Sequence, residues 1–434
     1  MKLKWLNGKK ASCLSFSSAN VSGYGTVPSK VWLHLGKLEI EMEVEVDPLL
    51  PANTIGISTA AFKPFAIPRH LPYRIRIKEN HIYIGPVIGM IVPAVRRLER
   101  YEDYLRDYEH IGGLICLFSP KDINAADRTI RACYYAPPAN GKPPVWKEIV
   151  IPYPDIVYRR AFGHDIPHEF VNEMGEKLFN PTVFDDKWKL WRVLFEDSDV
   201  CSHLPHTQKL NSIHDLDAML RTHSSVYVKR SQTLQSLGLF MVQKTADGYL
   251  FIDRDRNRIT LQSRDAPAFI KNLAESYLYH VQQAVPLKYY GRHVDFRVIM
   301  QKGRTRKWAC TGIFARFGAL DSVTTNFTEE GKLEAAKPAL QRIFRLNSKQ
   351  ASAKLQEIAR VCLKCCRRID QFGTFGDVGF DVIVDPKMNI WILEINKFPQ
   401  NNLPLYIRGQ RELYYHMMRQ PFEYAKSLAG FESG

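Results

Sequence analysis

The C-terminal part of the chain carries oxygen-bearing side chains that are spaced for one face of a β-hairpin. Glu394 and Asn396 lie two residues apart in an apolar segment, and residues i and i+2 of a strand point to the same face. Asp381 lies in the preceding apolar segment, 379–384, and Asp385-Pro-Lys-Met-Asn389 between them is typical of a turn. Two carboxylates and an amide oxygen suit Mg²⁺ that is held jointly with substrate phosphates. The alternative is a hairpin edge whose polar residues face water, but apolar neighbours favour a binding partner for them.

Four cationic side chains precede this hairpin. Lys229 ends the apolar segment 226–228, and Lys187 lies at the predicted start of a helix. Arg297 and Arg316 lie on consecutive predicted strands and could share one face of a sheet. A lysine at a strand end is usually a surface residue, although it can also act as a point charge for a phosphate. Taken singly, each of the four is more often structural, so their order along the chain carries the argument.

Hydrophobic periodicity predicts a mixed α/β chain of three domains. Residues 31–46 alternate apolar and charged side chains, which predicts half-buried strands in a small β module over residues 1–78. Residues 79–178 predict an α/β domain, with strands at 81–91, 113–118 and 150–158, a helix at 95–110, and a helix or loop at 122–133. Residues 179–434 predict a larger domain with helices at 268–277 and 353–372 and several hairpins.

Composition limits the function classes. Hydrophobic residues make up 45% and charged residues 24%, which excludes a mainly disordered chain, a collagen and a coiled-coil rod. The net charge of +15 favours polyanionic partners, but no long Lys/Arg run singles out nucleic acid, which is not an expected partner. The cluster Cys362, Cys365 and Cys366 falls in a helical pattern and is interpreted as helix packing instead of a zinc site. Since the N-terminus does not resemble a secretory signal and the longest apolar stretch, 82–95, is broken by Gly and Pro, we expect a cytoplasmic protein without a membrane span.

The motifs, taken in order from about residue 180 to residue 402, resemble the ATP-grasp superfamily. The resemblance implies an ATP-grasp fold of two α/β subdomains, preceded here by the β module and by an α/β domain like those that precede ATP-grasp domains. It implies that ATP and Mg²⁺ are cofactors. Lys187 and Lys229 match the nucleotide lysines, segment 281–285 resembles the hinge strand that brackets adenine, and the motif Asp295-Phe-Arg297 is similar to that of the superfamily. The site residues implied are Lys187, Lys229, Gln282, Gln283 and Val285 for the nucleotide, Asp381, Glu394 and Asn396 for the metal, and Arg297, Arg316 and Asn326 for catalysis.

Within that superfamily the chain is most similar to the YheC/YheD group of endospore-associated proteins. Segments 27–33, 83–91 and 391–396 carry this resemblance. It implies an ATP-dependent ligase that joins an unidentified carboxylate to an amine or thiol through an acyl-phosphate. It also implies that the protein is associated with the spore and that spore coat proteins are partners.

The chain departs from the superfamily pattern in its phosphate loop. Residues 230–240 contain one glycine, Gly238, and Arg230 stands where the pattern has proline. A loop that is poor in glycine is strained when its backbone N–H groups wrap a phosphate. The main alternative is therefore a degenerate ATP-grasp protein that senses nucleotide or serves as a structural component of the spore coat. A nucleic-acid binder is supported by net charge alone.

Overall fold

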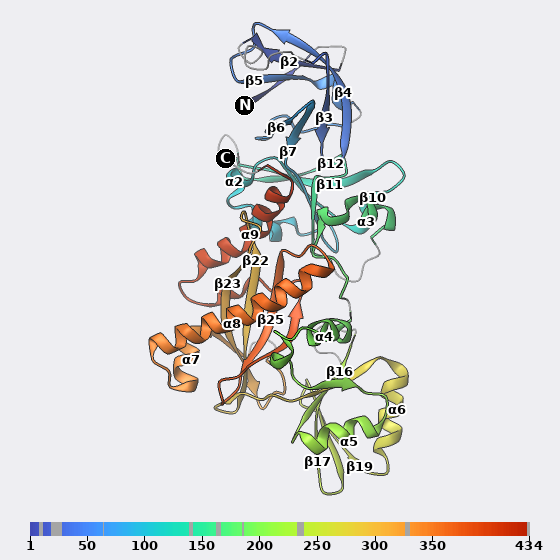
Figure 1. Ribbon diagram of the computed structural model, residues 1–434, viewed down its shortest axis with the longest axis vertical. Coiled ribbons are helices and arrows are strands. Elements are labelled where there is room, and N and C mark those ends of the chain that lie inside the picture. Colours follow the sequence, from blue (N-terminus) through green and yellow to red (C-terminus); the bar gives the residue numbers. More distant parts are fainter. Residues whose placement is uncertain are drawn as a thin grey trace. The chain divides into compact units, whose positions relative to one another are not determined.

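The computed structural model describes residues 1–7, 12–18, 28–63, 65–138, 142–161, 166–184, 186–231, 238–325 and 330–431. These residues form two compact units. Unit 1 comprises residues 1–181, 302–307 and 415–434, and unit 2 comprises residues 182–301 and 308–414. Figure 1 shows the chain in sequence colours. The division into three domains at residues 78 and 178 remains a prediction.

The first sheet of unit 1 has seven strands in the order β1-β5-β2-β4-β3-β7-β6. It confirms the predicted strands in residues 31–46, where Met42 is fully buried between exposed glutamates on β4. The strands are β1 (Lys2–Leu6), β2 (Cys13–Ser17), β3 (Lys30–Leu35), β4 (Leu38–Asp47), β5 (Thr54–Ser58), β6 (Arg74–Lys78) and β7 (His81–Gly85).

The predicted strand segments 81–91, 113–118 and 150–158 contain strands at 87–91, 114–118 and 156–159, which pair in parallel in the second sheet of unit 1. The segments 81–91 and 150–158 each hold parts of two strands, since 81–85 belongs to the first sheet and 150–152 to a separate strand. Its strands are β8 (Val87–Ile91), β9 (Leu114–Phe118), β10 (Ile123–Asn124), β11 (Thr129–Ala136), β12 (Val145–Pro152), β13 (Ile156–Arg159) and β14 (Leu178–Phe179). The short helix α3 (His168–Met174) also belongs to unit 1.

Two expectations for this region need correction. Residues 122–133 form mainly strand, namely β10 and most of β11 joined by a turn at 125–128, because Ile130, Ala132 and Tyr134 alternate with more exposed residues and bury one face. The helix expected at 95–110 is broken into a 3-10 segment, Leu98–Leu105, and the short α2 (Tyr108–Ile111). Arg97 precedes the 3-10 segment with a left-handed backbone (φ 52°). Its side chain makes no capping hydrogen bond to the backbone N–H groups of the first turn.

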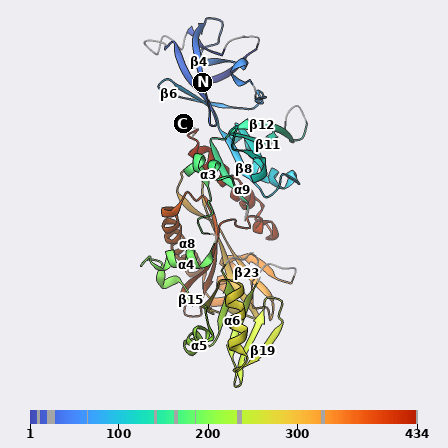
Figure 2. The same cartoon turned by 90° about the vertical axis from the view of Figure 1, so that its right-hand side faces the viewer.

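The first sheet of unit 2 has the order β15-β20-β16-β17-β18-β19 and is antiparallel. Its strands are β15 (Thr207–Lys209), β16 (Val226–Arg230), β17 (Leu239–Lys244), β18 (Gly248–Asp253), β19 (Arg258–Gln262) and β20 (Tyr279–Gln283). Val226 and Val228 share a core with helices α5 (Ile213–Thr222) and α6 (Ala266–Ser276), which lie along this sheet (Figures 1 and 2). Since side chains alternate along a strand, Tyr227 and Lys229 face the opposite side.

The second sheet of unit 2 has the order β24-β23-β22-β25-β26, with β21 paired to β22. The strands are β21 (Lys288–Tyr289), β22 (Arg292–Lys302), β23 (Trp308–Leu320), β24 (Lys332–Ala335), β25 (Asp377–Val384) and β26 (Ile390–Asn396). The helices α4 (Lys187–Phe195), α7 (Ala336–Phe344) and α8 (Ser348–Ile369) pack with it in one core (Figure 1).

Helix α8 confirms the interpretation of the cysteine cluster. Cys362, Cys365 and Cys366 form no disulfide among the described residues and are fully buried in the core of unit 2. The last helix, α9 (Arg411–Leu428), contributes Phe422 and Tyr424 to the aromatic contacts of unit 1. In the part of the chain that the structure describes, no helix combines the length and apolarity needed to span a bilayer.

Candidate functional site

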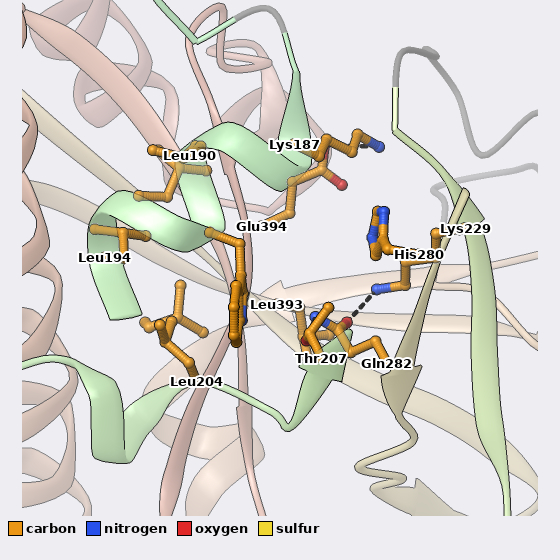
Figure 3. Close-up of a pocket in the computed structure, with 13 residues that line it drawn as sticks. Lys187, Leu190, Leu194, Leu204, Thr207, Lys229, His280, Gln282, Leu393 and Glu394 are labelled. Carbon is orange, nitrogen blue, oxygen red and sulfur yellow. Dashed lines mark hydrogen bonds and ion pairs between the residues drawn. The ribbon is translucent and has the colours of Figure 1, made fainter. Parts of the chain in front are cut away.

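Lys229 stands on the face of β16 that is turned away from helices α5 and α6. In the antiparallel pair β16–β20, Lys229 lies opposite His280 and Tyr227 lies opposite Gln282. The Lys229 Nζ donates to Gln282 Oε1 at 2.5 Å, and Gln282 Nε2 donates to Thr207 Oγ1 at 3.0 Å on β15 (Figure 3). This chain of hydrogen bonds fixes the ammonium of Lys229 near the sheet surface.

Lys187 approaches the same place from the N-terminus of α4. The Asp186 carboxylate caps the helix by accepting the backbone N–H of Trp188 at 2.8 Å, and the backbone N–H of Lys187 donates to Ser231 O at 3.2 Å. The Lys187 Nζ lies 3.1 Å from Glu394 Oε1. Lys187, Lys229 and Glu394 line one cavity, so the two lysines and the predicted metal carboxylate face each other (Figure 3).

A second cavity adjoins the first within unit 2, and the two share Lys229, Gln282, Leu393 and Glu394 in their linings. They are therefore neighbouring parts of one cleft. The second cavity adds the predicted hinge residues Gln283 and Val285 and the predicted metal ligand Asp381.

The register of β25 and β26 places the predicted metal ligands side by side. Asp381 pairs with Glu394, and Asn396 pairs with Gly379. An irregularity between Asp381 and Val382 shifts the register, and it leaves both Leu393 and Glu394 in the lining of the cleft. A regular strand would point neighbouring residues to opposite faces.

Asp381 belongs to a network of buried ion pairs. Its Oδ1 accepts a hydrogen bond from Arg297 Nε at 2.6 Å and lies 3.0 Å from an Arg316 terminal nitrogen. Arg316 also donates to Asp295 at 2.7 Å, and the Thr325 hydroxyl donates to the same carboxylate. Burial by itself would raise the pKa of Asp381, but the guanidinium groups of Arg297 and Arg316 outweigh it and lower the pKa to about 2. Asp381 is therefore an anion at neutral pH.

The oxygen donors of this hairpin fit a magnesium ion. Among the described residues, no group of three or more His, Cys, Asp or Glu side chains is arranged to hold a metal by itself. The predicted set of two carboxylates and one amide would leave coordination positions to water and phosphate, as Mg²⁺ prefers. Asn396 Nδ2 is buried and has no hydrogen-bond partner among the described residues, whereas metal binding would use the other atom of this amide, Oδ1.

Three basic groups that line the cleft have lowered pKa values. Burial, opposed in part by the Glu394 carboxylate, lowers the pKa of Lys229 to about 8. Burial, with the charges of Lys229 and Lys187 adding to it, lowers the pKa of His280 to about 3. Burial, with the charge of Lys288 adding to it, lowers the pKa of His293 in the second cavity to about 4. At neutral pH the cleft therefore presents the ammonium of Lys229 and two neutral imidazoles.

The structure brings most of the predicted site residues together. The cleft is lined by Lys187, Lys229, Gln282, Gln283, Val285, Asp381 and Glu394. Arg297 and Arg316 are buried and pair with Asp381. Asn326 lies outside the described residues. Sequence reasoning missed His280, although its spacing of two from Gln282 on a predicted strand is the signal that would have placed it on the same face.

Two α/β sheets that enclose a cleft with paired lysines and an acidic hairpin are the arrangement expected of the ATP-grasp class. Residues 175–428 match the family described as YheC/D-like ATP-grasp, which is more than half of the chain. The chain belongs to this family, and the predicted resemblance and the ATP-grasp fold class are confirmed.

The chain is similar to two proteins of Bacillus subtilis (strain 168). It is 24% identical over 408 residues to "Endospore coat-associated protein YheD", covering 87% of this chain and 86% of that protein. It is 21% identical over 298 residues to "Endospore coat-associated protein YheC", covering 65% of this chain and 79% of that protein. Among solved structures, VanG D-Ala:D-Ser ligase from Enterococcus faecalis shares 11% identity with a TM-score of 0.46, covering 80% of this chain and 99% of that chain. The family assignment depends on the sequence match and not on this structural likeness.

Proposed function

We propose that this protein binds Mg·ATP in the cleft of unit 2 and uses it to join a carboxylate to an amine or a thiol. The observation that supports the proposal is the convergence of Lys187 and Lys229 on a cavity that Glu394 also lines. Ammonium groups from two distant chain segments, set beside a carboxylate that can hold a metal, suit a polyphosphate and its counter-ion.

Each residue set has a distinct task in this proposal. Lys187 and Lys229 offset the charge of the α- and β-phosphates, and the backbone of residues 283–285 reads the edge of adenine. Asp381, Glu394 and Asn396 hold Mg²⁺, which when bound neutralises phosphate charge. Arg297 and Arg316 keep Asp381 ionised through their contacts with it. They, together with Asn326, are also proposed to steady the oxygens of the transferring phosphoryl or acyl group.

The reaction has two steps. A carboxylate oxygen attacks the γ-phosphorus of ATP, which forms an acyl-phosphate and releases ADP. The amine or thiol then attacks the acyl carbon, phosphate leaves, and an amide or thioester results. Positioning and charge neutralisation supply most of the rate enhancement in phosphoryl transfer, which is what a cleft with fixed cations provides.

Calorimetric titration with ATP, with and without magnesium, tests the binding part of the proposal. We expect heat release that is stronger with magnesium. Neither heat nor a thermal shift at millimolar ATP would refute nucleotide binding. ADP release that rises when a carboxylic acid and an amine or thiol are added together would support ligase activity.

A non-catalytic nucleotide binder is the second candidate, and the glycine-poor segment 230–240 favours it. Saturable ATP binding with no ADP release across a broad panel of acids, amines and thiols would establish this candidate over the ligase.

The names of the two relatives motivate a proposal on location: we propose that this protein is associated with the spore and contacts spore coat proteins. A tagged chain that co-fractionates with the coat layer of purified spores would support it. Recovery in the mother-cell lysate alone would oppose it.

A further inference from the structure

A buried histidine lies between the two lysines of the cleft. His280 stands directly opposite Lys229 in the β16–β20 pair, and its imidazole lies between the side chains of Lys187 and Lys229 in Figure 3. It lines the same cavity as these lysines and Glu394. A histidine in a protein core is commonly a structural residue, but His280 is on the face of the sheet that borders the cleft.

The hydrogen bond made by His280 involves Nδ1 and not Nε2. Its Nδ1 lies 3.1 Å from the Ser231 hydroxyl oxygen. Ser231 is completely buried, and a buried hydroxyl needs an acceptor for its single hydrogen. With the Ser231 hydroxyl as the donor, the neutral imidazole carries its proton on Nε2; with Nδ1–H as the donor, it would carry the proton on Nδ1.

The surroundings keep this imidazole uncharged. Burial and the neighbouring charges of Lys229 and Lys187 lower its pKa to about 3. A third cation beside two ammonium groups would be costly in the free protein, whereas a neutral N–H donor is not. His280 thus offers a hydrogen bond without adding to the repulsion between the lysines.

We propose that His280 binds the polyphosphate of the nucleotide by donating its Nε2–H hydrogen bond to a phosphate oxygen held between Lys187 and Lys229. The inference rests on the proposed nucleotide-binding function and adds a third phosphate-contacting residue to it. The hydrogen bond has a charged acceptor, and such bonds are stronger than bonds between neutral groups.

The test compares ADP with adenosine, which lacks the phosphates. Full-length wild-type protein, His280→Leu and His280→Gln are titrated with ADP plus magnesium and with adenosine. We expect His280→Leu to weaken ADP binding by on the order of tenfold to a hundredfold, as for loss of a hydrogen bond to a charged group, with adenosine binding unchanged. The amide nitrogen of His280→Gln can reach toward the position of Nε2, so this variant should recover most of the ADP affinity.

Three outcomes are separable. ADP affinity in His280→Leu equal to that of wild type would overturn the inference, and so would an equal loss of ADP and adenosine binding, which indicates a structural role. Absence of ADP and ATP binding by the wild-type protein would instead refute the proposed function itself.

If His280→Leu fails to fold, the wild-type protein still decides the matter. In protein labelled with ¹⁵N at histidine, the His280 signals, assigned by their absence in His280→Gln, should report the Nε2–H tautomer. The Nε2 resonance should shift with ADP and not with adenosine. An Nδ1–H tautomer, or an Nε2 resonance that does not shift with ADP, would rule out the hydrogen bond from Nε2–H to the phosphate.

Discussion

Lys229 is an ammonium group that is partly removed from water, and its pKa of about 8 makes nucleotide affinity depend on pH. Bound polyphosphate favours the ammonium form. Below the pKa of the free protein the proton is already present, whereas above it each binding event must take up a proton. ATP affinity is therefore expected to be constant near pH 7 and to fall above pH 8 by up to about tenfold per pH unit. Calorimetry of Mg·ATP binding across this range measures it.

Lys229→Arg is the matched variant for this prediction. Its guanidinium stays charged throughout the range, so the pH dependence should disappear even if the absolute affinity changes. Lys189→Arg, at an exposed position of α4, should keep the wild-type profile. A wild-type affinity that stays flat up to pH 9.5 would show that Lys229 does not meet the phosphates.

Glu394 is the predicted metal ligand that also contacts a lysine of the cleft. Glu394→Ala removes a carboxylate donor next to Asp381, so we expect magnesium to lose most of its effect on ATP affinity. Titrations of ATP at increasing magnesium concentration compare the variant with wild type. Glu275→Ala, an exposed change on α6, is the control. Unchanged magnesium dependence in Glu394→Ala would reject the ligand assignment.

At the residue scale, much of the candidate site could be predicted from the sequence. Lys229 and the acidic hairpin stand out because their charged side chains lie in apolar strands, and Lys187 stands out at the start of a predicted helix. The support of Asp381 by Arg316, and of Arg316 by Asp295, could not be predicted. These contacts depend on the register between strands that are far apart in the chain.

At the scale of elements, the turn after β23 forms part of the wall of the cleft. A Cβ on Gly318 would overlap the carbonyl oxygen of Thr324, and Thr324 and Thr325 line the second cavity. Gly318→Ala must therefore displace this turn. We expect a loss of about 1–3 kcal/mol in the free energy of unfolding, as for overpacking, together with weaker ATP binding.

Denaturant unfolding and ATP titration of Gly318→Ala check this prediction. Ala309→Val adds volume at an exposed position of the same strand and should change neither quantity. If Gly318→Ala keeps the wild-type free energy of unfolding and the wild-type ATP affinity, the turn can accommodate a Cβ without being displaced.

Elements with strong periodicity could be predicted, and weakly patterned ones could not. The alternation of β4 and the apolar hairpin β25–β26 were predicted correctly because strand periodicity is local information. The prediction of a helix or loop at 122–133 was wrong for most of this segment. The pairing of β11 with β9 and β12 outweighs the low strand propensity of the polar residues at its start. The helix expected at 95–110 begins only after the left-handed Arg97 and is interrupted at 106–107, and no pattern marks either position.

At the scale of the whole molecule, the described part of the predicted cleft belongs to one unit. Unit 2 contains β16, β20 and β26, and unit 1 contains β1 to β5. ATP binding should therefore slow amide hydrogen exchange in β16, β20 and β26. At a ligand concentration a hundredfold above Kd, binding can raise the free energy of the opening that permits exchange by at most about 2.7 kcal/mol.

Hydrogen exchange followed by mass spectrometry, with and without Mg·ATP, measures this change. Exchange in β1 to β5 is the internal reference and should stay the same. A Lys187→Ala/Lys229→Ala double variant should lose the protection in unit 2. Equal protection of β1 to β5 would contradict a site confined to unit 2.

The sequence by itself determined the family, the order of the motifs and the strands that carry them, because these are properties of neighbouring residues. The tertiary structure decided which groups meet: Lys187 with Glu394, Arg297 with Asp381, and His280 beside both lysines. It also decided that unit 2 is built from two separate stretches of chain. Such pairings depend on strand register and on an irregularity in β25–β26, and long-range packing sets both.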